Sequence, residues 1–521
     1  MNIHTLGELR ASAYRVRSVK DEMRENLLGK ISRGEPTFSG IHGYERTVLP
    51  AVHNAVLSRH DIILLGLRGQ AKTRILRSLT GLLDERIPII EGCEINDSPF
   101  TPSCKRCRRL AAEKGDDLPV AWLDRDDRYR EKLATPDVTV ADLIGDIDPI
   151  KAANQRLTYA DEEVIHYGII PRTNRGIFAI NELPDLAPRI QVALLNILEE
   201  RDLQIRGFPI RIPMDVVLVF SANPEDYTSR GNIITPLKDR IASQILTHYP
   251  QSVETAMQIT QQEAWLDREF KTNIEIPEYV KSLIEQLAFV ARGSELVDQS
   301  SGVSARLTIA AMELLQSNME RRAVLTKDAS VFPRLSDLAM LLPAITGKVE
   351  MVYEGEQQGA EVVARKLVGM AVAKLFETKF PPVERAGGGR ERDRKHNDME
   401  DDDDAFASRR GKRAPQREEP KASSPSEPNY DSVLAWFVEG NKITLSDEQP
   451  FREFFAELNR VPKLADTARK YTRPAHDAEL AFWMEMVLES LHQALRLSRE
   501  DLDSTITFQE MMKFNMLRTV R

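Results

Sequence analysis

Hydrophobic and polar positions along the chain predict a region of alternating strands and helices. Between residues 43 and 249, short continuous apolar runs alternate with segments of helical period. Three of these runs are "DIILLG" from Asp61, "GIFAIN" from Gly176 and "DVVLVFSAN" from Asp215. Uninterrupted apolar runs of this length are typical of parallel strands that are covered on both faces. The pattern therefore predicts an α/β fold built on a parallel sheet.

The same pattern divides the whole chain into five regions. Residues 1–40 are predicted to be an N-terminal helical segment, and residues 41–250 the α/β domain. Residues 251–381 keep a helical period without strand signals, which predicts a helical domain. Residues 382–428 have almost no apolar content and contain blocks of like charge, so we expect a disordered linker. Residues 429–521 return to an ordered pattern and are predicted to be a C-terminal helical domain.

The stretch "AELAFWMEMVLESLHQAL" in the last region predicts a helix with one apolar face. The residues of that face are Leu480, Trp483, Met484, Val487, Leu488 and Leu491. Apolar residues at i, i+3 and i+4 spacing lie on one side of a helix and need to be covered. Two interpretations stay open: the face is the core of a small helical domain, or it docks on a partner.

A phosphate-binding loop is predicted directly after the first apolar run. The stretch from Gly66 to Thr73 matches the template G-x-x-x-x-G-K-[ST], except that Ala71 replaces the second glycine. Backbone N–H groups and the N-terminus of the following helix would hold phosphates, and Lys72 would reach the β- and γ-phosphates. The Thr73 hydroxyl would bind Mg²⁺. The predicted nucleotide-binding residues are Gly66, Leu67, Arg68, Gly69, Gln70, Ala71, Lys72, Thr73 and Arg74.

Two points of this loop stay open at the level of sequence. Ala71 adds a Cβ that is unfavourable if the loop needs a positive φ at that position. Its N–H is still available, so the substitution alone does not remove the phosphate cradle. The alternative to a phosphate loop is an ordinary strand–turn–helix with a chance Lys-Thr pair.

The other two strands end in polar residues that suit ATP hydrolysis. Glu182 can orient or deprotonate the attacking water. Asn181 stands where most ATPases carry aspartate, and its amide oxygen can accept a hydrogen bond from metal-bound water without adding negative charge. We therefore expect weaker Mg²⁺ binding rather than loss of the site. Asn223 is placed to hold the γ-phosphate or the attacking water. The alternative is a buried strand that happens to end in Asn-Glu.

In this order the motifs resemble those of AAA+ ATPases, specifically the magnesium chelatase ATPase subunit and its MoxR-type relatives. The resemblance spans roughly residues 41–375, and MoxR-type members commonly carry alanine at the position that matches Ala71. It implies an α/β fold with an AAA+ P-loop parallel sheet flanked by helices. It also implies an all-α lid domain over residues 251–381, followed here by a C-terminal helical extension that lies outside the resemblance.

The resemblance implies roles for three further polar residues. Asn223 matches the sensor-1 residue of the family. Arg240, in "PLKDRIA", matches the arginine finger, which acts in the site of the neighbouring subunit, and Arg230 is a second candidate for that role. Arg306, in "SGVSARLTIAAME", matches sensor 2. For each arginine the alternative is a surface ion pair.

Two inserted segments also fit this group. "DLQIRGFPIRIP" alternates apolar and polar residues around a Gly-Phe-Pro turn, which predicts a β-hairpin. It matches the presensor-1 hairpin, and residues 138–171 look like the helix-2 insert. In relatives these loops face the pore or the client; scaffold hairpins without client contact are the alternative.

The three cysteines of the chain, Cys93, Cys104 and Cys107, all lie in "GCEINDSPFTPSCKRC". A C-x₂-C pair with a third cysteine nearby is compatible with a zinc site. We identified no fourth ligand in this stretch, so a histidine or an acidic side chain would have to supply it. A structural Zn²⁺ site, three free thiols and a redox role therefore stay open.

Net charge, hydropathy and cysteine content narrow the expected partners and cellular location of the protein. A net charge of −9 gives no overall basic footprint, so no specific nucleic-acid partner is expected. No apolar run approaches the length of a membrane span, and the first 30 residues contain no apolar signal region. Three cysteines in 521 residues fit a reducing cytoplasm, so a cytoplasmic location is predicted.

The resemblance implies an ATP- and Mg²⁺-dependent ring, most simply a hexamer, with ATP bound between subunits. The implied partner is a von Willebrand factor A-type protein with a metal-ion-dependent adhesion site. Such a ring either powers Mg²⁺ insertion into a porphyrin, as in magnesium chelatase, or remodels other proteins, as in MoxR-type relatives. A scaffold that binds nucleotide but hydrolyses it negligibly, because of Asn181, is the alternative of another class.

Overall fold

The structure is a computed structural model that describes residues 3–158, 161–205, 211–224, 232–383, 430–502 and 505–511. These residues form two compact units. The first unit comprises Met1–Gln262 and Gln299–Ala305, and the second comprises Glu263–Asp298 and Arg306–Arg521. The predicted linker lies almost wholly outside the described residues.

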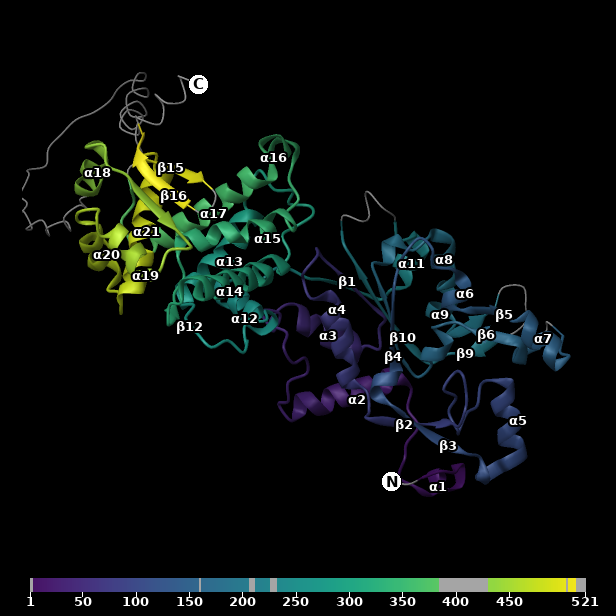
Figure 1. Cartoon of the computed structure of the whole chain (residues 1–521). Coiled ribbons are helices and arrows are strands. Elements are labelled where there is room, and N and C mark those ends of the chain that lie inside the picture. The colour runs from purple at the N-terminus through teal and green to yellow at the C-terminus, as the bar shows by residue number, and fades with distance from the viewer. Residues whose placement is uncertain are drawn as a thin grey trace, which may run out of the picture. The chain divides into compact units, whose positions relative to one another are not determined.

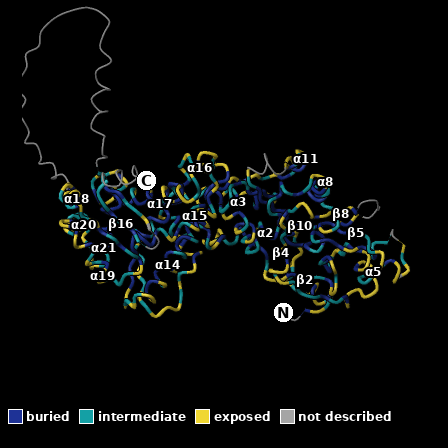
Figure 2. The backbone as a smooth tube through the Cα atoms, turned by 45° about the horizontal axis from the view of Figure 1, so that its top comes forward, coloured by how far each residue is buried: buried dark blue, intermediate teal, exposed yellow. Residues whose placement is uncertain are grey.

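A five-stranded parallel sheet is the centre of the first unit (Figure 1). From one edge to the other its strands are β11 (Ser243–Leu246), β1 (Ile62–Leu65), β10 (Val216–Ala222), β7 (Gly176–Asn181) and β4 (Tyr129–Leu133). All seven residues of β10 are buried, as expected for a central strand with both faces covered (Figure 2). The polar residues that follow β1, β10 and β7 therefore lie together at the carboxyl ends of these parallel strands.

Helices cover the two faces of this sheet. Alternate residues of a strand point to opposite faces, so Ile62 and Leu64 enter one apolar cluster and Ile63 enters the other. The first cluster is completed by α2 (Val19–Ser32), α3 (Val48–Leu57) and α4 (Lys72–Ser78). The second is completed by α8 (Pro188–Ala193), α9 (Leu195–Glu199) and α11 (Thr235–Arg240).

The N-terminal segment contains the two helices α1 (Leu6–Ala11) and α2, and α2 is tied to the sheet by a buried ion pair. Arg128 donates from both terminal nitrogens to the two carboxylate oxygens of Glu22 on α2, at 2.7 and 2.6 Å. Its Nε donates to the carbonyl of Arg175 at 2.9 Å. The Arg128 side chain is 1% exposed and that of Glu22 5%. Because neither charge reaches water, the ion pair offsets the desolvation penalty of both groups.

Three antiparallel strand pairs project from the central sheet. The predicted hairpin is confirmed by β8 (Asp202–Gln204) and β9 (Arg211–Pro213), whose turn at residues 206–210 lies outside the described residues. The predicted insert at 138–171 contains α6 (Val140–Leu143), β5 (Gly145–Ile147), α7 (Pro149–Gln155) and β6 (Ile165–Tyr167). The third pair is β2 (Arg86–Ile90) and β3 (Val120–Asp124), with α5 (Lys105–Lys114) in the connection between them.

The second unit is mainly helical. Its elements before the undescribed linker are β12 (Asn273–Ile274), α13 (Glu278–Arg292), α14 (Arg306–Thr326), β13 (Ser330–Val331), α15 (Leu342–Thr346), α16 (Tyr353–Gln358) and α17 (Ala360–Glu377). After the linker follow α18 (Asp431–Val438), β14 (Ile443–Ser446), α19 (Phe451–Leu458), α20 (Leu464–Thr472), α21 (Asp477–Gln493), β15 (Leu497–Leu502) and β16 (Thr505–Glu510). All residues of helix α12 (Val253–Glu263) except the last belong to the first unit.

The predicted apolar helix face lies at the centre of the second unit. All six of its residues are at most 1% exposed, and α21 packs against α17, α19 and α20. These contacts support the interpretation of the face as core rather than as a docking surface. The helical pattern did not predict the three-stranded antiparallel sheet of β14, β16 and β15 beside α21. Among the described residues, no helix has the length and apolarity needed to cross a membrane.

Candidate functional site

The phosphate loop of the first unit follows β1 and leads into α4. A Cβ at Gly66 would collide with the Thr247 hydroxyl and the Gln70 amide oxygen, so only glycine fits this close approach. Gly69 has a φ of +75°, and Ala71 has a φ of +55° and a ψ of +18°. Ala71 therefore adopts the left-handed conformation, which costs an L-residue about 1 kcal/mol.

Side chains from two other segments, one with Tyr44 and one with Thr247 and Tyr249, fix this loop. The Thr247 hydroxyl donates to the Gln70 amide oxygen at 2.7 Å, and the Tyr44 hydroxyl donates to the Gln70 carbonyl at 2.9 Å. Burial raises the pKa of Tyr44 to about 12, so this hydroxyl remains a donor. The Tyr249 hydroxyl donates to the Arg68 carbonyl at 2.9 Å. The loop is thus held in one shape by contacts that the motif itself does not contain.

Leu67, Arg68 and Arg74 have different surroundings. Arg68 Nε donates to the carbonyl of Ser301 at 3.0 Å. Leu67 lies close to Gly302, where a Cβ would approach its side chain to 2.8 Å. Arg74 is exposed on α4.

Lys72 lies at the centre of a cluster of polar groups at the strand ends. Its ammonium group donates to the carbonyl of Gly66, to the carbonyl of Leu67 at 3.0 Å and to Asn223 Oδ1 at 2.5 Å. Lys72 is 7% exposed. A buried ammonium needs such acceptors, because transfer of a charge out of water is otherwise unfavourable.

The Asn-Glu pair at the end of β7 joins the same cluster. Asn181 Oδ1 accepts a hydrogen bond from the Ser221 hydroxyl at 3.2 Å and lies 3.5 Å from the Thr73 hydroxyl. Glu182 Oε2 accepts from Asn223 Nδ2 at 2.9 Å. Glu182 has a φ of +56°, a sparsely populated conformation for a residue with a side chain, and such strain is frequent at functional sites.

Asn223 therefore bridges the two groups of opposite charge. Its amide oxygen faces the Lys72 ammonium and its amide nitrogen faces the Glu182 carboxylate. This orientation of the amide follows from the partners, since an ammonium only donates and a carboxylate only accepts. The sequence placed Asn223 near the γ-phosphate but did not predict this bridge.

The structure brings together Lys72, Thr73, Asn181, Glu182 and Asn223, five of the predicted residues, and adds Ser221. The Ser221 hydroxyl accepts from the Glu182 backbone N–H at 3.3 Å while it donates to Asn181. Ser221 lies two residues before Asn223 in "FSAN", the spacing that puts two side chains on the same face of a strand, but a serine in a buried strand carries no functional pattern by itself. The donor set fits Mg²⁺ and a phosphate chain, because hydroxyl, amide and carboxylate oxygens suit Mg²⁺ and an ammonium suits phosphate.

The predicted arginines belong to other segments of the chain. Arg240, the last residue of α11, pairs with Glu199 at 2.6 Å and donates to the carbonyl of Pro236 at 3.0 Å. It lies three residues before β11, whose first residue pairs with the first residue of β1. Arg306 is the first residue of α14 in the second unit, and Arg230 lies outside the described residues.

The cysteines form a group of their own in the connection between β2 and β3. Cys93 follows β2, Cys104 caps the N-terminus of α5, and Cys107 lies in its first turn. Asp97, which the sequence did not single out, lies among them.

Comparison with protein families agrees with this geometry. The family model described as "AAA domain (dynein-related subfamily)" matches residues 121–241, which run from β3 through β7 and β10 to the end of α11. The chain therefore contains an AAA+ domain. The AAA+ resemblance and the predicted α/β fold class are confirmed. No curated protein matches the chain in sequence.

Several solved structures resemble the chain at low identity. The complex of magnesium chelatase subunits BchI and BchD is 19% identical, with 62% of this chain and 98% of that chain covered and a TM-score of 0.31. NtrX from Brucella abortus in complex with ADP is 13% identical, with coverage of 57% and 55% and a TM-score of 0.32. A RuvB variant from Thermotoga maritima is 13% identical, with coverage of 70% and 78% and a TM-score of 0.31. Because these similarities are low, the assignment rests on the family model and the sheet.

Proposed function

We propose that the protein is an ATPase of the magnesium chelatase and MoxR-type group that hydrolyses ATP between the subunits of a ring. One observation carries the proposal: Asn223 links the Lys72 ammonium to the Glu182 carboxylate beside Thr73 and Asn181. An ammonium for phosphate, oxygens for Mg²⁺ and a carboxylate for water are the parts that phosphoryl transfer needs.

Each residue of the cluster has a distinct part in this reaction. Lys72 exchanges its carbonyl acceptors for the β- and γ-phosphate oxygens of ATP. Thr73 and, through water, Asn181 would hold Mg²⁺, which neutralises charge on the phosphates when it is bound. Glu182 accepts a proton from the attacking water, and Asn223 keeps the Glu182 carboxylate oriented. Asn181 contributes no charge, so we expect a higher Mg²⁺ requirement than an aspartate would give.

The arginine finger has to come from a second copy of the chain. Arg240 is held at the end of α11 by Glu199 and by a carbonyl of its own helix. Lys72 and Glu182 instead share an asparagine, and these separate partners support action of Arg240 in a neighbouring subunit's site. There a guanidinium neutralises charge that develops on the γ-phosphate. We infer that the subunits form a ring, a hexamer in the simplest case, in which Arg306 acts as sensor 2. We further infer that the ring works with a von Willebrand factor A-type partner and is cytoplasmic. We favour protein remodelling over metal insertion into a porphyrin as the process that ATP hydrolysis drives.

ATP turnover by the purified ring tests the catalytic assignment. We expect Glu182→Gln to lower kcat by at least about a hundredfold while nucleotide affinity stays, because only proton acceptance is lost. Glu113→Gln on α5, where Glu113 is exposed, is the matched control and should turn over like the wild type. If the wild type hydrolyses no faster than Glu182→Gln with Mg²⁺ and partner present, the nucleotide-binding scaffold is the better description.

Nucleotide binding tests the phosphate loop separately. We expect Lys72→Ala to lose binding of a fluorescent ATP analogue, whereas Lys114→Ala, an exposed lysine at the end of α5, should bind like the wild type. Retained affinity in Lys72→Ala would contradict the loop assignment, whatever the turnover of the protein.

A further inference from the structure

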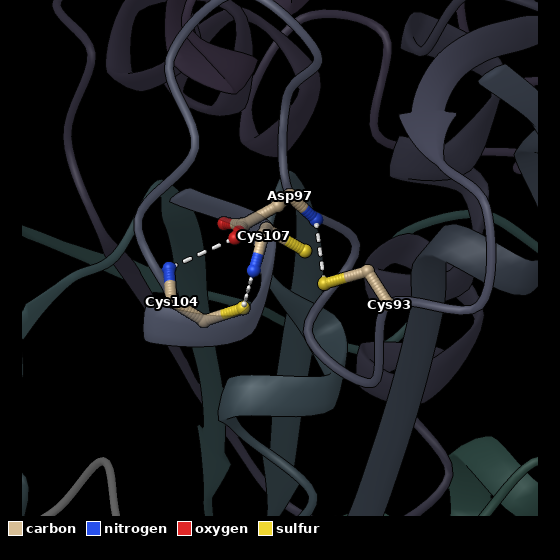
Figure 3. A group of neighbouring side chains, drawn as sticks. All are labelled: Cys93, Asp97, Cys104 and Cys107. Carbon is tan, nitrogen blue, oxygen red and sulfur yellow. Dashed lines mark hydrogen bonds between the residues drawn. The ribbon is translucent and has the colours of Figure 1, made fainter. Parts of the chain in front are cut away.

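The connection between β2 and β3 contains a compact group of metal-binding side chains that ATP hydrolysis does not use. Cys93, Asp97, Cys104 and Cys107 each offer one ligand atom, and these atoms all lie within 4.8 Å of one another (Figure 3). Asp97, Cys104 and Cys107 are buried, and Cys93 is partly buried. We propose that these four residues bind one zinc ion that holds the connection in its folded shape.

The spacing of the ligand atoms suits a tetrahedral centre. Zn–S bonds of about 2.3 Å place the sulfur atoms of such a centre about 3.8 Å apart. The four atoms are already gathered to within roughly an ångström of this arrangement, and small side-chain rotations close the remainder. Three sulfurs and one carboxylate oxygen complete a four-coordinate shell, which is the usual form of a structural zinc site.

The backbone around the group is organised toward the sulfur atoms. The N–H of Asp97 donates to Cys93 Sγ at 3.4 Å, and the N–H of Cys107 donates to Cys104 Sγ at 3.4 Å (Figure 3). Hydrogen bonds to sulfur favour the thiolate, which is the form that binds metal. Arg106 donates to the carbonyl of Gly92, beside Cys93, at 3.0 Å and adds positive charge near the group.

Asp97 gives an independent indication of a ligand. Its Oδ2 accepts a hydrogen bond from the backbone N–H of Cys104 at 2.9 Å. Its Oδ1 is buried and has no hydrogen-bond partner among the described residues, and Asp97 as a whole is 1% exposed. A buried carboxylate oxygen without a partner is costly, so such atoms usually have a function. A bond from Oδ1 to a cation satisfies it.

The choice of ligands selects the metal. Thiolates are soft ligands that favour zinc, whereas Mg²⁺ and Ca²⁺ prefer shells made only of oxygen. The Mg²⁺ of the nucleotide site therefore does not compete here. The connection is also the kind of segment that benefits from a metal: residues 91–104 contain no helix or strand, and Cys104 begins the first helix after them.

Metal analysis of the purified full-length protein tests the proposal. We expect about one zinc per chain, and a Co²⁺-substituted protein with the intense visible absorption of a tetrahedral thiolate site. The three thiols should react with a disulfide reagent only after a chelator has removed the metal. Asp97→Asn keeps the size of the side chain and should lower zinc affinity by at least about tenfold. Asp117→Asn is the control, because Asp117 is exposed in the turn after α5, and it should leave zinc affinity unchanged.

Three outcomes would overturn the proposal. One is a zinc-free protein whose three thiols react at once; another is a mass two hydrogens lower, which marks a disulfide. The third is zinc that remains bound with unchanged affinity in both Asp97→Asn and Cys104→Ser, since the metal then lies elsewhere. The Co²⁺ spectrum is recorded on the wild type, so it decides the matter even if a variant fails to fold.

Discussion

Glu485 makes the stability of the second unit depend on pH. This residue lies on α21, is 2% exposed and accepts a hydrogen bond from the backbone N–H of Leu335 at 2.9 Å. Burial raises the pKa of Glu485 to about 7, against the lowering effects of that hydrogen bond and of Arg334. The ordinary value is 4.5. The folded protein therefore holds a proton on Glu485 over a pH range in which the unfolded chain has lost it.

The sign and size of the effect follow from these two values. Between pH 4.5 and about 7 the native state binds more protons than the unfolded state, so the free energy of unfolding falls as the pH rises. A difference of about 2.5 pKa units corresponds to about 3 kcal/mol, fully lost above pH 7. Glu485→Gln keeps a hydrogen-bond acceptor of the same size but cannot ionise. We expect it to match the wild type at pH 4.5 and to be more stable by up to about 3 kcal/mol at pH 8.

Urea unfolding at several pH values measures this difference. Three of the four tryptophans, Trp265, Trp436 and Trp483, lie in the second unit, so tryptophan fluorescence follows mainly that unit. The control is Glu453→Gln, because Glu453 is exposed on α19, and it should leave the pH dependence of the midpoint as in the wild type. The reasoning is refuted if the stability difference between Glu485→Gln and the wild type stays constant from pH 4.5 to pH 8.

Three further predictions concern the first unit. Asn223→Asp should lower ATP turnover by at least about a hundredfold, because a second carboxylate would face Glu182 where the amide nitrogen now donates; phosphate release measures this, and unchanged turnover would contradict the bridge. Glu22→Gln should lower the free energy of unfolding by about 3–5 kcal/mol, because the Arg128 charge stays buried without its partner; a loss under about 1 kcal/mol in denaturant titration would contradict this. Ala71→Gly should keep nucleotide affinity and change the free energy of unfolding by less than about 1 kcal/mol, because relief of backbone strain and the greater chain entropy of glycine oppose each other. Ala71→Val should lose affinity in a fluorescent-nucleotide titration.

The fold of the first unit could be predicted from sequence because its strands are buried on both faces. Continuous apolar runs such as residues 216–220 have few alternatives to a central parallel strand. The sheet of β14, β15 and β16 was missed for the opposite reason. β14 and β16 alternate buried and partly buried positions, and β15 includes charged residues such as Arg499 and Glu500, so no continuous apolar run marks these strands in the sequence.

The site was predictable where a motif fixes chemistry and spacing together, as for Lys72, Thr73 and Glu182. Contacts between segments far apart in sequence were not predictable, because neither partner carries a pattern by itself. The hydrogen bond from Thr247 to Gln70 spans 177 positions and fixes the loop, and Asp97 is one acidic residue among many until folding places it between three sulfurs.

The buried pair of Glu22 and Arg128 extends the structural unit of the AAA domain beyond the residues of the family match. The family match begins at residue 121, yet β1, the phosphate loop and the carboxylate that neutralises Arg128 all lie upstream of it. A recombination event that moved only residues 121–241 would carry an unpaired buried charge and leave β10 without its neighbour. A transferable fragment that keeps this ion pair and the strand order therefore has to begin ahead of α2 and to include that helix.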